Sequence, residues 1–425
     1  MTVRAVRGFN DILPGTTEVW RRIEDEAAAL FRAYGFSEIK VPVVERTELF
    51  ARSIGEATDI VEKEMYTFRD RRGDSLTLRP EGTAPVVRAY IENKLYTAPV
   101  TRLFYGGPMF RYERPQKGRY RQFHQIGAEV LGDGSPWIDA ETMEMAVRLF
   151  ERLGVEGAEL HVNTLGCAQC RPGYKAALKD FLDARSERLC ADCRRRMETN
   201  PLRALDCKVP ACVDATADAP ALTDHVCREC AAHFDEVRRY LALLDASSTV
   251  NPRMVRGLDY YTRTTFEITA AGLGAQNAVA AGGRYDSLVR ELGGPQTPCF
   301  GFALGMERLS LVLGERPAPP SPLYFIALGR EAERAGTELV RGLRSAGLTV
   351  VTDYGEGSLR SRMKRAHRLG ASRTLILGDD ELCRGVVTVK EMATASQQAV
   401  PLAEAVSRLA GAMESRGAQA PKETV

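Results

Sequence analysis

Three features that particular protein classes require are missing from this sequence of 425 residues. No apolar stretch approaches the roughly 18 residues that a membrane-spanning helix needs. The N-terminal segment carries Arg4, Arg7 and Asp11 where a secretory signal would have its apolar part. Neither charge is in excess, since 58 Lys and Arg balance 56 Asp and Glu and leave a net charge of +2. We therefore expect a cytoplasmic protein that meets any nucleic acid through local basic patches.

The composition is that of a folded chain, with 44% hydrophobic and 27% charged residues. At roughly 150 residues per domain, the length suggests two or three domains. Helical spacing predicts a first helix that is capped by Thr16 or Thr17 and ends at Gly35. Its apolar positions are Trp20, Ile23, Ala27, Leu30, Phe31 and Tyr34.

Extended segments follow this first helix. The segment over 36–44 predicts a strand, and Pro42 inside it favours a sheet edge, where a strand can pair with another subunit. Two runs over 102–113 and 120–132 flank the loop RPQKGR and predict an antiparallel hairpin. Further predicted elements are a helix over 139–153, strands over 262–269 and 300–304, and a helix over 306–313.

Eight of the ten cysteines lie between Cys167 and Cys230, in a segment with helical spacing over 165–245. We expect this segment to be a helical insertion. The proline-rich sequence GERPAPPSP at 314–322 indicates a stiff linker. Beyond it, strands and helices alternate over 323–415, which predicts a small α/β domain with a largely parallel sheet, and the tail over 416–425 is expected to be flexible.

Side chains on the second strand of the hairpin suggest a binding surface. Phe123, Gln125 and Glu129 share one face, and Gly127 between them leaves room for a ligand. A solvated sheet face is the alternative explanation of this alternation.

Two later segments add polar and aromatic groups. RGLDYYTRTTFE at 256–267 and GGRYD at 282–286 combine Tyr hydroxyls with carboxylates, which suits a small polar ring, although a structural tyrosine cluster is the alternative. GFALGMERL at 301–309 turns from a strand into a helix whose first turn holds Arg308, a favourable place for an anion.

In this order the motifs resemble those of the class II aminoacyl-tRNA synthetases and, within that class, the histidyl-tRNA synthetase family. The strand with Pro42, FRYERPQKGRYRQFHQ and GFALGMERL are similar to the three class signatures. LRPEGTAP, RGLDYYTRT and AGGRYD are similar to the histidine-specific elements, and the resemblance spans about residues 4–410. It implies an α+β catalytic domain with an antiparallel sheet over 1–164 and 246–318, a helical insertion over 165–245, and a C-terminal α/β anticodon-binding domain over 323–415.

The resemblance also implies roles for individual residues. Arg111 would hold the α-phosphate of ATP and the histidine carboxylate, and Arg256 would place a fixed cation at the reacting groups, so these two are the expected catalytic residues. The expected histidine-binding residues are Glu81, Thr83, Arg111, Gln125, Glu129, Arg256, Tyr261 and Tyr285, with Glu129 and Tyr261 at the two imidazole nitrogens. The expected ATP-binding residues are Arg111, Glu113, Arg119, Phe123 and Arg308.

The implied activity is the ATP-dependent attachment of L-histidine to tRNA(His) through a histidyl-adenylate intermediate, with ATP as a substrate and Mg²⁺ bridging its phosphates. The implied assembly is a homodimer without membrane contact. In the C-terminal domain a helix carries five cations that either form a solvated face or contact tRNA phosphates, and the resemblance favours the second. These cations are Arg360, Arg362, Lys364, Arg365 and Arg368.

Two other functions compete with this interpretation. A non-catalytic paralogue, the histidine-sensing regulatory subunit of ATP phosphoribosyltransferase, reuses the same core, but it typically lacks the C-terminal domain and loses the motif arginines that are present here. A binding module for uncharged tRNA inside a regulator is the second alternative, and no effector domain accompanies it in this sequence.

The cysteine spacing predicts structural zinc, which the chemistry of the family does not require. Cys167 and Cys170 with Cys190 and Cys193 have the spacing of a four-cysteine zinc site. The remaining four would form a second set, namely Cys207, Cys212, Cys227 and Cys230. Small, partly buried residues without metal are the alternative, whereas disulfides are disfavoured in the cytosol.

Overall fold

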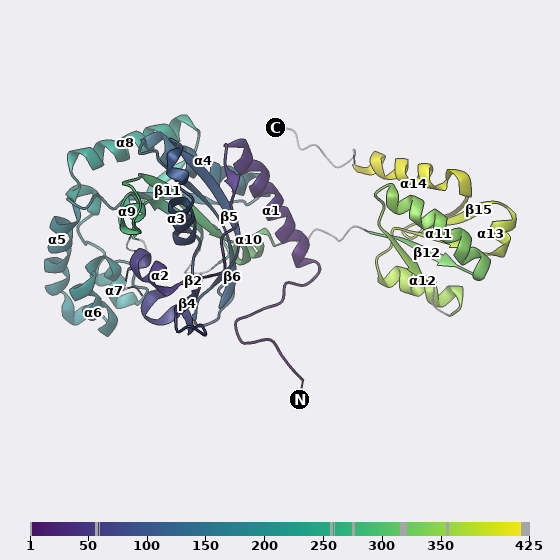
Figure 1. Cartoon of the computed structure of the whole chain (residues 1–425), viewed down its shortest axis with the longest axis horizontal. Helices are drawn as coiled ribbons and strands as arrows, with labels where there is room; N and C mark the ends of the chain where they lie inside the picture. Colours follow the sequence, from purple (N-terminus) through teal and green to yellow (C-terminus); the bar gives the residue numbers. More distant parts are fainter. Residues whose placement is uncertain are drawn as a thin grey trace. The chain divides into compact units, whose positions relative to one another are not determined.

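An eight-stranded, mainly antiparallel sheet organises the first of two units, residues 1–316 and 317–425, into which the chain divides (Figure 1). This computed structural model describes residues 2–55, 58, 60–255, 258, 260–273, 277–314, 321–353 and 357–417. Most of the predicted linker over 314–322 and of the predicted tail over 416–425 lies outside these ranges.

The strands of the large sheet come from distant parts of the chain. In sheet order they are β1 (Ser37–Glu38), β5 (Thr101–Phe110), β6 (Gln122–Leu131), β11 (Cys299–Gly305), β10 (Ala278–Arg284), β9 (Thr262–Thr269), β7 (Glu159–Thr164) and β8 (Ser248–Val250). The outer pairs β1–β5 and β7–β8 run parallel, and the pairs between them run antiparallel. The predicted antiparallel sheet is confirmed, as is the hairpin of β5 and β6.

One face of this sheet is covered by helices. They are α1 (Thr16–Ala33), α4 (Pro136–Leu153), α8 (Arg228–Leu243) and α10 (Met306–Leu313). Ile126, Ala128 and Val130 of β6 are buried in the core beneath them, whereas Phe123 and Gln125 on the other face line a cavity. The alternation along β6 therefore separates an apolar core face from a polar, functional face.

The first helix begins with a cap that differs from the prediction. The N-cap residue of α1 is Gly15, and the Glu18 carboxylate accepts its backbone N–H at 2.5 Å. The expected cap by Thr16 or Thr17 is wrong, because Glu18 already satisfies this end of the helix.

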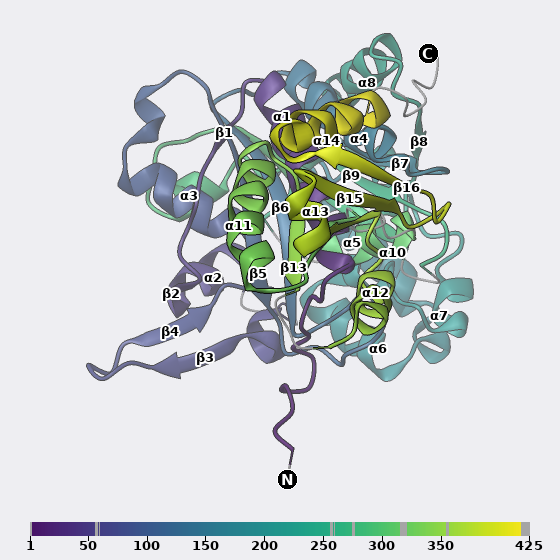
Figure 2. The ribbon, with the colours of Figure 1, turned by 90° about the vertical axis from the view of Figure 1, so that its right-hand side faces the viewer.

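The segment over 36–44 is not one strand. It forms β1 in the large sheet and then β2 (Val44–Arg46), which pairs with β4 (Ser75–Leu78) and β3 (Tyr66–Arg69) in a separate sheet, and β3 and β4 extend away from the large sheet in Figure 2. Between the two strands, buried Arg79 donates from Nη1 to the Val41 carbonyl at 2.8 Å. A side chain rather than a neighbouring strand thus satisfies the backbone beside Pro42, which has no N–H of its own.

On the second face of the large sheet, α3 (Thr83–Glu92) packs against β5, and further helical segments pack around α3. They are α2 (Thr47–Ile54), a π-helical turn (Ile60–Glu64), a 3₁₀ turn (Leu95–Thr97) and α9 (Leu288–Glu291). The α3 helix starts inside the motif LRPEGTAP, with Gly82 as its N-cap residue, and so places Glu81 and Thr83 at its N-terminus.

The predicted helical insertion consists of α5 (Arg171–Asp183), α6 (Ala191–Thr199), α7 (Pro210–Ala215) and three 3₁₀ turns (Ser186–Arg188, Pro201–Ala204, Leu222–His225) before α8. These helices gather at one end of the first unit in Figure 1. Leu178 and Leu182 of α5 are fully buried in a core that also contains Tyr261 and Tyr285. The insertion therefore shares an apolar core with one wall of the functional face.

The second unit has a five-stranded sheet in the order β13 (Val350–Asp353), β12 (Leu323–Ala327), β14 (Arg373–Leu377), β15 (Val386–Glu391) and β16 (Gln397–Pro401). Its helices are α11 (Arg330–Ser345), α12 (Leu359–Arg368), α13 (Asp379–Cys383) and α14 (Leu402–Gly417). The expectation of a largely parallel sheet is only partly correct. The pairs of β12 with β13 and β14 are parallel, whereas β14–β15 and β15–β16 are antiparallel because their connections are too short for a crossover.

No helix within the described parts of the chain combines the length and the apolar character that crossing a membrane requires.

Candidate active site

A cavity of about 440 Å³ opens on the face of the large sheet opposite α1 and α4. Its walls come from β6, β10 and β11, the loop of the β5–β6 hairpin, the start of α3 and the segment before β9. The structure brings most of the sequence-predicted site residues to this cavity. Those that line it are Glu81, Thr83, Arg111, Glu113, Arg119, Phe123, Gln125, Tyr261 and Arg308.

Three guanidinium groups surround one part of the cavity. The Nε of Arg111 donates to the Pro80 carbonyl at 2.8 Å, and its Cζ lies 5.3 Å from the ring centroid of Phe123. Arg308 donates from Nη1 to the Ala278 carbonyl at 2.6 Å, while burial and the charge of Arg119 lower its pKa. Because one bond fixes each of these arginines, their remaining N–H groups form a prepared anion site.

A carboxylate balances part of this positive charge. Glu113 accepts from Arg119 Nη1 at 3.2 Å, and its other oxygen lies 3.9 Å from Arg111 Nη1. The loop between the strands is closed by backbone pairing of Gln116 with Arg119. The hairpin loop thus holds Arg119 over the cavity instead of leaving it in solvent.

Another part of the cavity offers acceptors. The Glu81 carboxylate is buried and accepts the backbone N–H groups of Thr83 and Ala84 at 2.7 and 2.8 Å, and burial raises its pKa. The amide oxygen of Gln125 is buried, and the described residues offer it no hydrogen-bond donor. A buried carbonyl oxygen without a donor is costly, so this atom is suited to receive an N–H from a ligand.

Glu129 lies behind the cavity wall, fully buried. Its Oε1 accepts from the Thr83 hydroxyl at 2.8 Å and more weakly from Tyr105 at 3.4 Å, and its Oε2 accepts from the Tyr285 hydroxyl at 2.5 Å. Burial raises its pKa to about 8. Glu129 and Tyr285 are therefore near the cavity but reach it through the hydroxyls of Thr83 and Tyr105, which line it.

The space beside Gly127 is filled by protein. A Cβ at Gly127 would lie 2.4 Å from the Tyr105 ring, and Tyr105 is its direct partner on β5. The expectation that Gly127 leaves room for a ligand is therefore wrong, because this room belongs to a tyrosine of the neighbouring strand.

Several cavity residues were not predicted from the sequence. Tyr105 and Glu267 project from strands of the large sheet, and Arg203 with Asp206 comes from the insertion. The alternation of β5 would have been a usable signal for Tyr105, whereas nothing in the local pattern links position 203 to the core. The predicted residue Arg256 lies outside the described residues.

Arg284 of the segment over 282–286 has a structural role. Arg284 is fully buried and forms ion pairs with Asp139 and, at 3.1 Å, with Asp286. His233 of α8 also contacts Asp139, at 2.8 Å. This network ties the end of β10 to α4 and α8.

The basic helix of the second unit is only partly a surface. Arg362 is buried and donates to the Ala327 carbonyl at 2.6 Å, and Arg365 is paired with Asp353 at 2.7 Å. The prediction of five cations on one basic surface is wrong for Arg362, which ties α12 to β12, whereas Arg365 stays half-exposed at the surface with its charge paired to Asp353. Arg360, Lys364 and Arg368 remain exposed.

The chain is similar to known proteins over nearly its whole length. The profile of the family described as "Histidyl-tRNA synthetase" matches residues 8–309, and that described as "Anticodon binding domain" matches residues 323–411. The histidine–tRNA ligase of Trichlorobacter lovleyi is 56% identical over 404 residues, 95% of this chain and 96% of that protein. That of Syntrophotalea carbinolica is 54% identical over 405 residues, with coverages of 95% and 97%.

Solved structures show the same fold. The apo histidyl-tRNA synthetase of S. aureus superimposes with a TM-score of 0.80 at 35% identity and covers 96% of this chain and 100% of that one. A chain from Bacillus halodurans described as "ATP phosphoribosyltransferase regulatory subunit/histidyl-tRNA synthetase" gives 0.66 at 21% identity, which shows the fold alone.

An antiparallel sheet that brings the predicted second and third signature segments to one cavity is the catalytic architecture of class II aminoacyl-tRNA synthetases. Within that class, the chain belongs to the histidyl-tRNA synthetase family, as the match over 8–309 and the identities above 50% show. The predicted family, fold class and enzyme class are confirmed.

Proposed function

We propose that this chain attaches L-histidine to tRNA(His) in an ATP-dependent reaction through a histidyl adenylate. The observation that carries the proposal is that three arginines and the acceptor groups of Glu81 and Gln125 line the same cavity. Cations suit the triphosphate and carboxylate of the two substrates, and acceptors suit the α-ammonium and imidazole groups. The family membership of the chain supports the same reaction.

For ATP, we assign the arginine-rich part of the cavity. Phe123 offers a ring for stacking on the adenine, with Arg308 on the opposite side and Glu113 at its edge, while Arg111 and Arg119 bind phosphate oxygens. Reactions of this enzyme class use Mg²⁺, which is bound through phosphates and one or two carboxylates, and Glu113 and Glu267 in the cavity wall fit that requirement. Such an ion neutralises phosphate charge.

For histidine, we assign the acceptor-rich part of the cavity. Glu81, Thr83 and Gln125 would hold the α-ammonium, and the unpartnered Gln125 oxygen supports this placement. The imidazole would lie against Tyr261 and the hydroxyls that lead to Glu129, with Tyr285 fixing the far oxygen of that carboxyl. Arg256, outside the described residues, remains the proposed second cation at the reacting groups.

The chemistry needs no nucleophile from the protein. The histidine carboxylate attacks the α-phosphorus of ATP and pyrophosphate leaves, after which the terminal ribose hydroxyl of tRNA attacks the carbonyl of the adenylate and AMP leaves. Arg111, which lines the cavity, would bind both the attacking carboxylate and the α-phosphate, and so would align them and stabilise the charge that develops. Catalysis thus consists of alignment and charge stabilisation.

We further propose a cytoplasmic homodimer, as the family resemblance implies. Static light scattering of the purified chain tests the dimer: a mass near twice 46.8 kDa supports it, and a mass near 46.8 kDa contradicts it.

The assay that tests the function is amino-acid-dependent exchange of pyrophosphate into ATP. Histidine should support exchange and the other amino acids should not. Exchange with a different amino acid alone would contradict the assignment. If no amino acid supported exchange but the chain still bound histidine, the result would favour the regulatory paralogue. Among the described residues, the arginines that line the cavity do not favour that alternative.

Glu129→Gln should weaken histidine binding roughly 3- to 10-fold, the usual effect of one neutral hydrogen bond, because it alters the acceptor that orients the Thr83 and Tyr105 hydroxyls towards the cavity. The Gln side chain keeps the volume and one acceptor for Tyr285, so the fold should persist. Calorimetric titration with histidine measures the effect, and the KM for ATP is the internal control. Unchanged histidine affinity would remove Glu129 from the histidine site.

The same carboxyl should make folding pH-dependent. Because burial raises its pKa in the folded chain to about 8, the protonated form is stabilised by folding, and this stability is lost as the pH rises towards 8. Its titratable neighbours are Glu81, Tyr105 and Tyr285. Between pH 5 and 8 the free energy of unfolding should fall by up to about 1.4 kcal/mol per pH unit relative to Glu129→Gln. Urea unfolding at several pH values measures this difference, and parallel curves for both chains would contradict it.

A further inference from the structure

The eight cysteines of the insertion form two clusters, and their grouping differs from the sequence prediction. The outer cysteine cluster comprises Cys167, Cys170, Cys227 and Cys230, and the inner cysteine cluster comprises Cys190, Cys193, Cys207 and Cys212. Within each cluster all sulfur atoms lie within 4.8 Å of one another. The predicted pairing of the first two Cys-x-x-Cys motifs in one site is wrong. The first motif is grouped with Cys227 and Cys230, and the second motif with Cys207 and Cys212, so the inner cluster is nested in the sequence between the two halves of the outer cluster.

The sulfur spacing matches a tetrahedral metal site. Zn–S bonds of about 2.3 Å place the four sulfurs of a tetrahedron roughly 3.8 Å apart. The sulfurs of Cys167 and Cys170 are 3.5 Å apart, and those of Cys170 and Cys230 are 3.9 Å apart. In the inner cluster Cys190 and Cys207 are 4.0 Å apart. A disulfide needs about 2.05 Å, so these thiols are arranged around a common centre rather than bonded in pairs.

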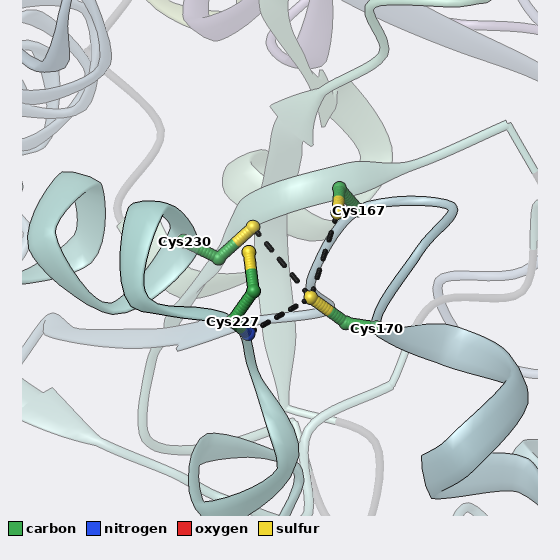
Figure 3. A group of neighbouring side chains, drawn as sticks. All are labelled: Cys167, Cys170, Cys227 and Cys230. Atoms are coloured by element: carbon green, nitrogen blue, oxygen red, sulfur yellow. Dashed lines mark hydrogen bonds between the residues drawn. The ribbon is translucent and has the colours of Figure 1, made fainter.

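Helix N-termini position most of the ligands. Cys170 and Cys227 are the N-cap residues of α5 and α8, and Cys190 is the N-cap residue of α6. Figure 3 shows the four side chains of the outer cluster converging, with dashed lines from the sulfur of Cys170 to the sulfurs of Cys167 and Cys230 and to the backbone nitrogen of Cys227. The backbone N–H of Cys227 donates to that sulfur at 3.0 Å. Backbone donors and the positive ends of helices stabilise the negative charge of four thiolates around one metal ion.

The backbone also supports the inner cluster. The N–H of Cys190 donates to the Cys212 sulfur at 3.1 Å, and the N–H of Cys193 donates to the Cys190 sulfur at 3.5 Å. Cys193 and Cys212 are fully buried, whereas Cys190 and Cys207 are half-buried. Each cluster has two buried and two half-buried cysteines, and the buried pair of the inner cluster is part of the apolar core that contains Leu178 and Leu182.

We propose that each cluster binds one zinc ion, giving two nested four-cysteine zinc sites in the insertion. Four sulfur ligands exclude Ca²⁺ and Mg²⁺, which bind oxygen, and tetrahedral sulfur coordination is typical of zinc. The outer site joins the start of α5 to the start of α8 and so closes the base of the insertion. The inner site joins α6 to the segment that leads into α7.

The inner site has a consequence for the active site. Arg203 and Asp206, which line the cavity, lie four positions and one position before the ligand Cys207. Zinc at the inner site fixes this segment and hence this part of the cavity wall. Zinc binding at the inner site is therefore expected to support substrate binding. This consequence rests on the proposed function, whereas the proposal that the chain binds zinc does not depend on it.

Elemental analysis of the full chain, purified without chelator, should find two zinc ions per chain, and X-ray absorption should show four sulfurs at about 2.3 Å. The paired variant Cys190→Ser/Cys207→Ser should retain one zinc, and so should Cys167→Ser/Cys227→Ser. These pairs spare the fully buried cysteines. Cys383→Ser, which removes an exposed cysteine outside both clusters, is the control and should retain two.

Less than one zinc per chain with eight freely titratable thiols under native conditions overturns the proposal, and so does iron in place of zinc. A single zinc per chain overturns the two-site assignment. A variant can fail to fold, so the second measurement uses the unmodified chain. Its thiols are titrated under native conditions before and after chelation, and the eight thiols of the two clusters should become reactive only as zinc is released. Pyrophosphate exchange then tests whether zinc at the inner site supports substrate binding. The KM values for the substrates should rise several-fold in the inner-site variant and change less in the outer-site variant.

Discussion

Arg111→Ala should lower the rate of histidyl-adenylate formation by roughly 100- to 1,000-fold, the effect of removing one prepared donor from a transition state. The guanidinium of Arg111 is held by the Pro80 carbonyl and lies against Phe123, so it is oriented before the substrates bind. Single-turnover adenylation measured with saturating ATP and histidine tests this effect. Arg111→Lys should recover only part of the rate, because an ammonium cannot bridge carboxylate and phosphate as a planar fork does.

Arg114→Ala is the matched control for this substitution. Arg114 lies on the same loop but is exposed and does not line the cavity, so its removal should leave adenylation unchanged. If Arg111→Ala also kept a near-normal rate, the charge-stabilising role would belong to another residue, and the assignment of Arg111 as a catalytic residue would be wrong.

A chain that ends at Arg316 should still form histidyl adenylate but should charge tRNA at least about 100-fold more slowly. Losses of this size are typical when one of two linked binding contacts is removed. Adenylate formation should persist because the cavity and its apolar cores lie within residues 1–316, and the second unit has its own core. Pyrophosphate exchange and tRNA charging, measured on the same preparation, separate the two steps.

A full-length variant provides the control for the shortened chain. Replacing the exposed cations Arg360, Lys364 and Arg368 by alanine should weaken charging and reduce its salt dependence while leaving exchange unaffected. Replacing Arg362 should instead destabilise the second unit, because its buried guanidinium bonds to the Ala327 carbonyl. An equal loss of exchange and charging in the shortened chain would mean that the second unit supports the core rather than binding tRNA.

Local patterns were enough to predict the elements whose neighbours are close in sequence. The β5–β6 hairpin, the helix over 306–313 and the apolar face of β6 follow from alternation and turn residues within a few tens of positions. The predicted cavity residues were brought together largely because the family motifs sit on adjacent strands β6 and β11. In these cases the local preference and the tertiary arrangement agree.

Predictions failed where a distant side chain or chain segment decides the structure. The predicted strand at Pro42 is interrupted where the Arg79 side chain bonds to the Val41 carbonyl. The space beside Gly127 is filled by the Tyr105 ring, and only the pairing of β5 with β6 reveals this contact. The cysteines were grouped by sequence order, but the insertion folds back so that Cys170 meets Cys230. No strand was predicted over Ala278–Arg284, which forms β10 in the interior of the sheet.

The ring of Tyr105 makes three positions dependent on one another. It fills the space at Gly127 and also lies 2.0 Å from where a Cβ at Gly82 would be, so two glycines from separate segments accommodate one side chain. A methyl group at either position must displace the same ring, because position 82 faces its Cε2 edge and position 127 its Cε1 edge, so a shift that relieves one contact changes the other. The effects of such substitutions are therefore non-additive. In relatives of this chain, a smaller residue at position 105 should accompany side chains at positions 82 and 127, so that the three positions vary as a set.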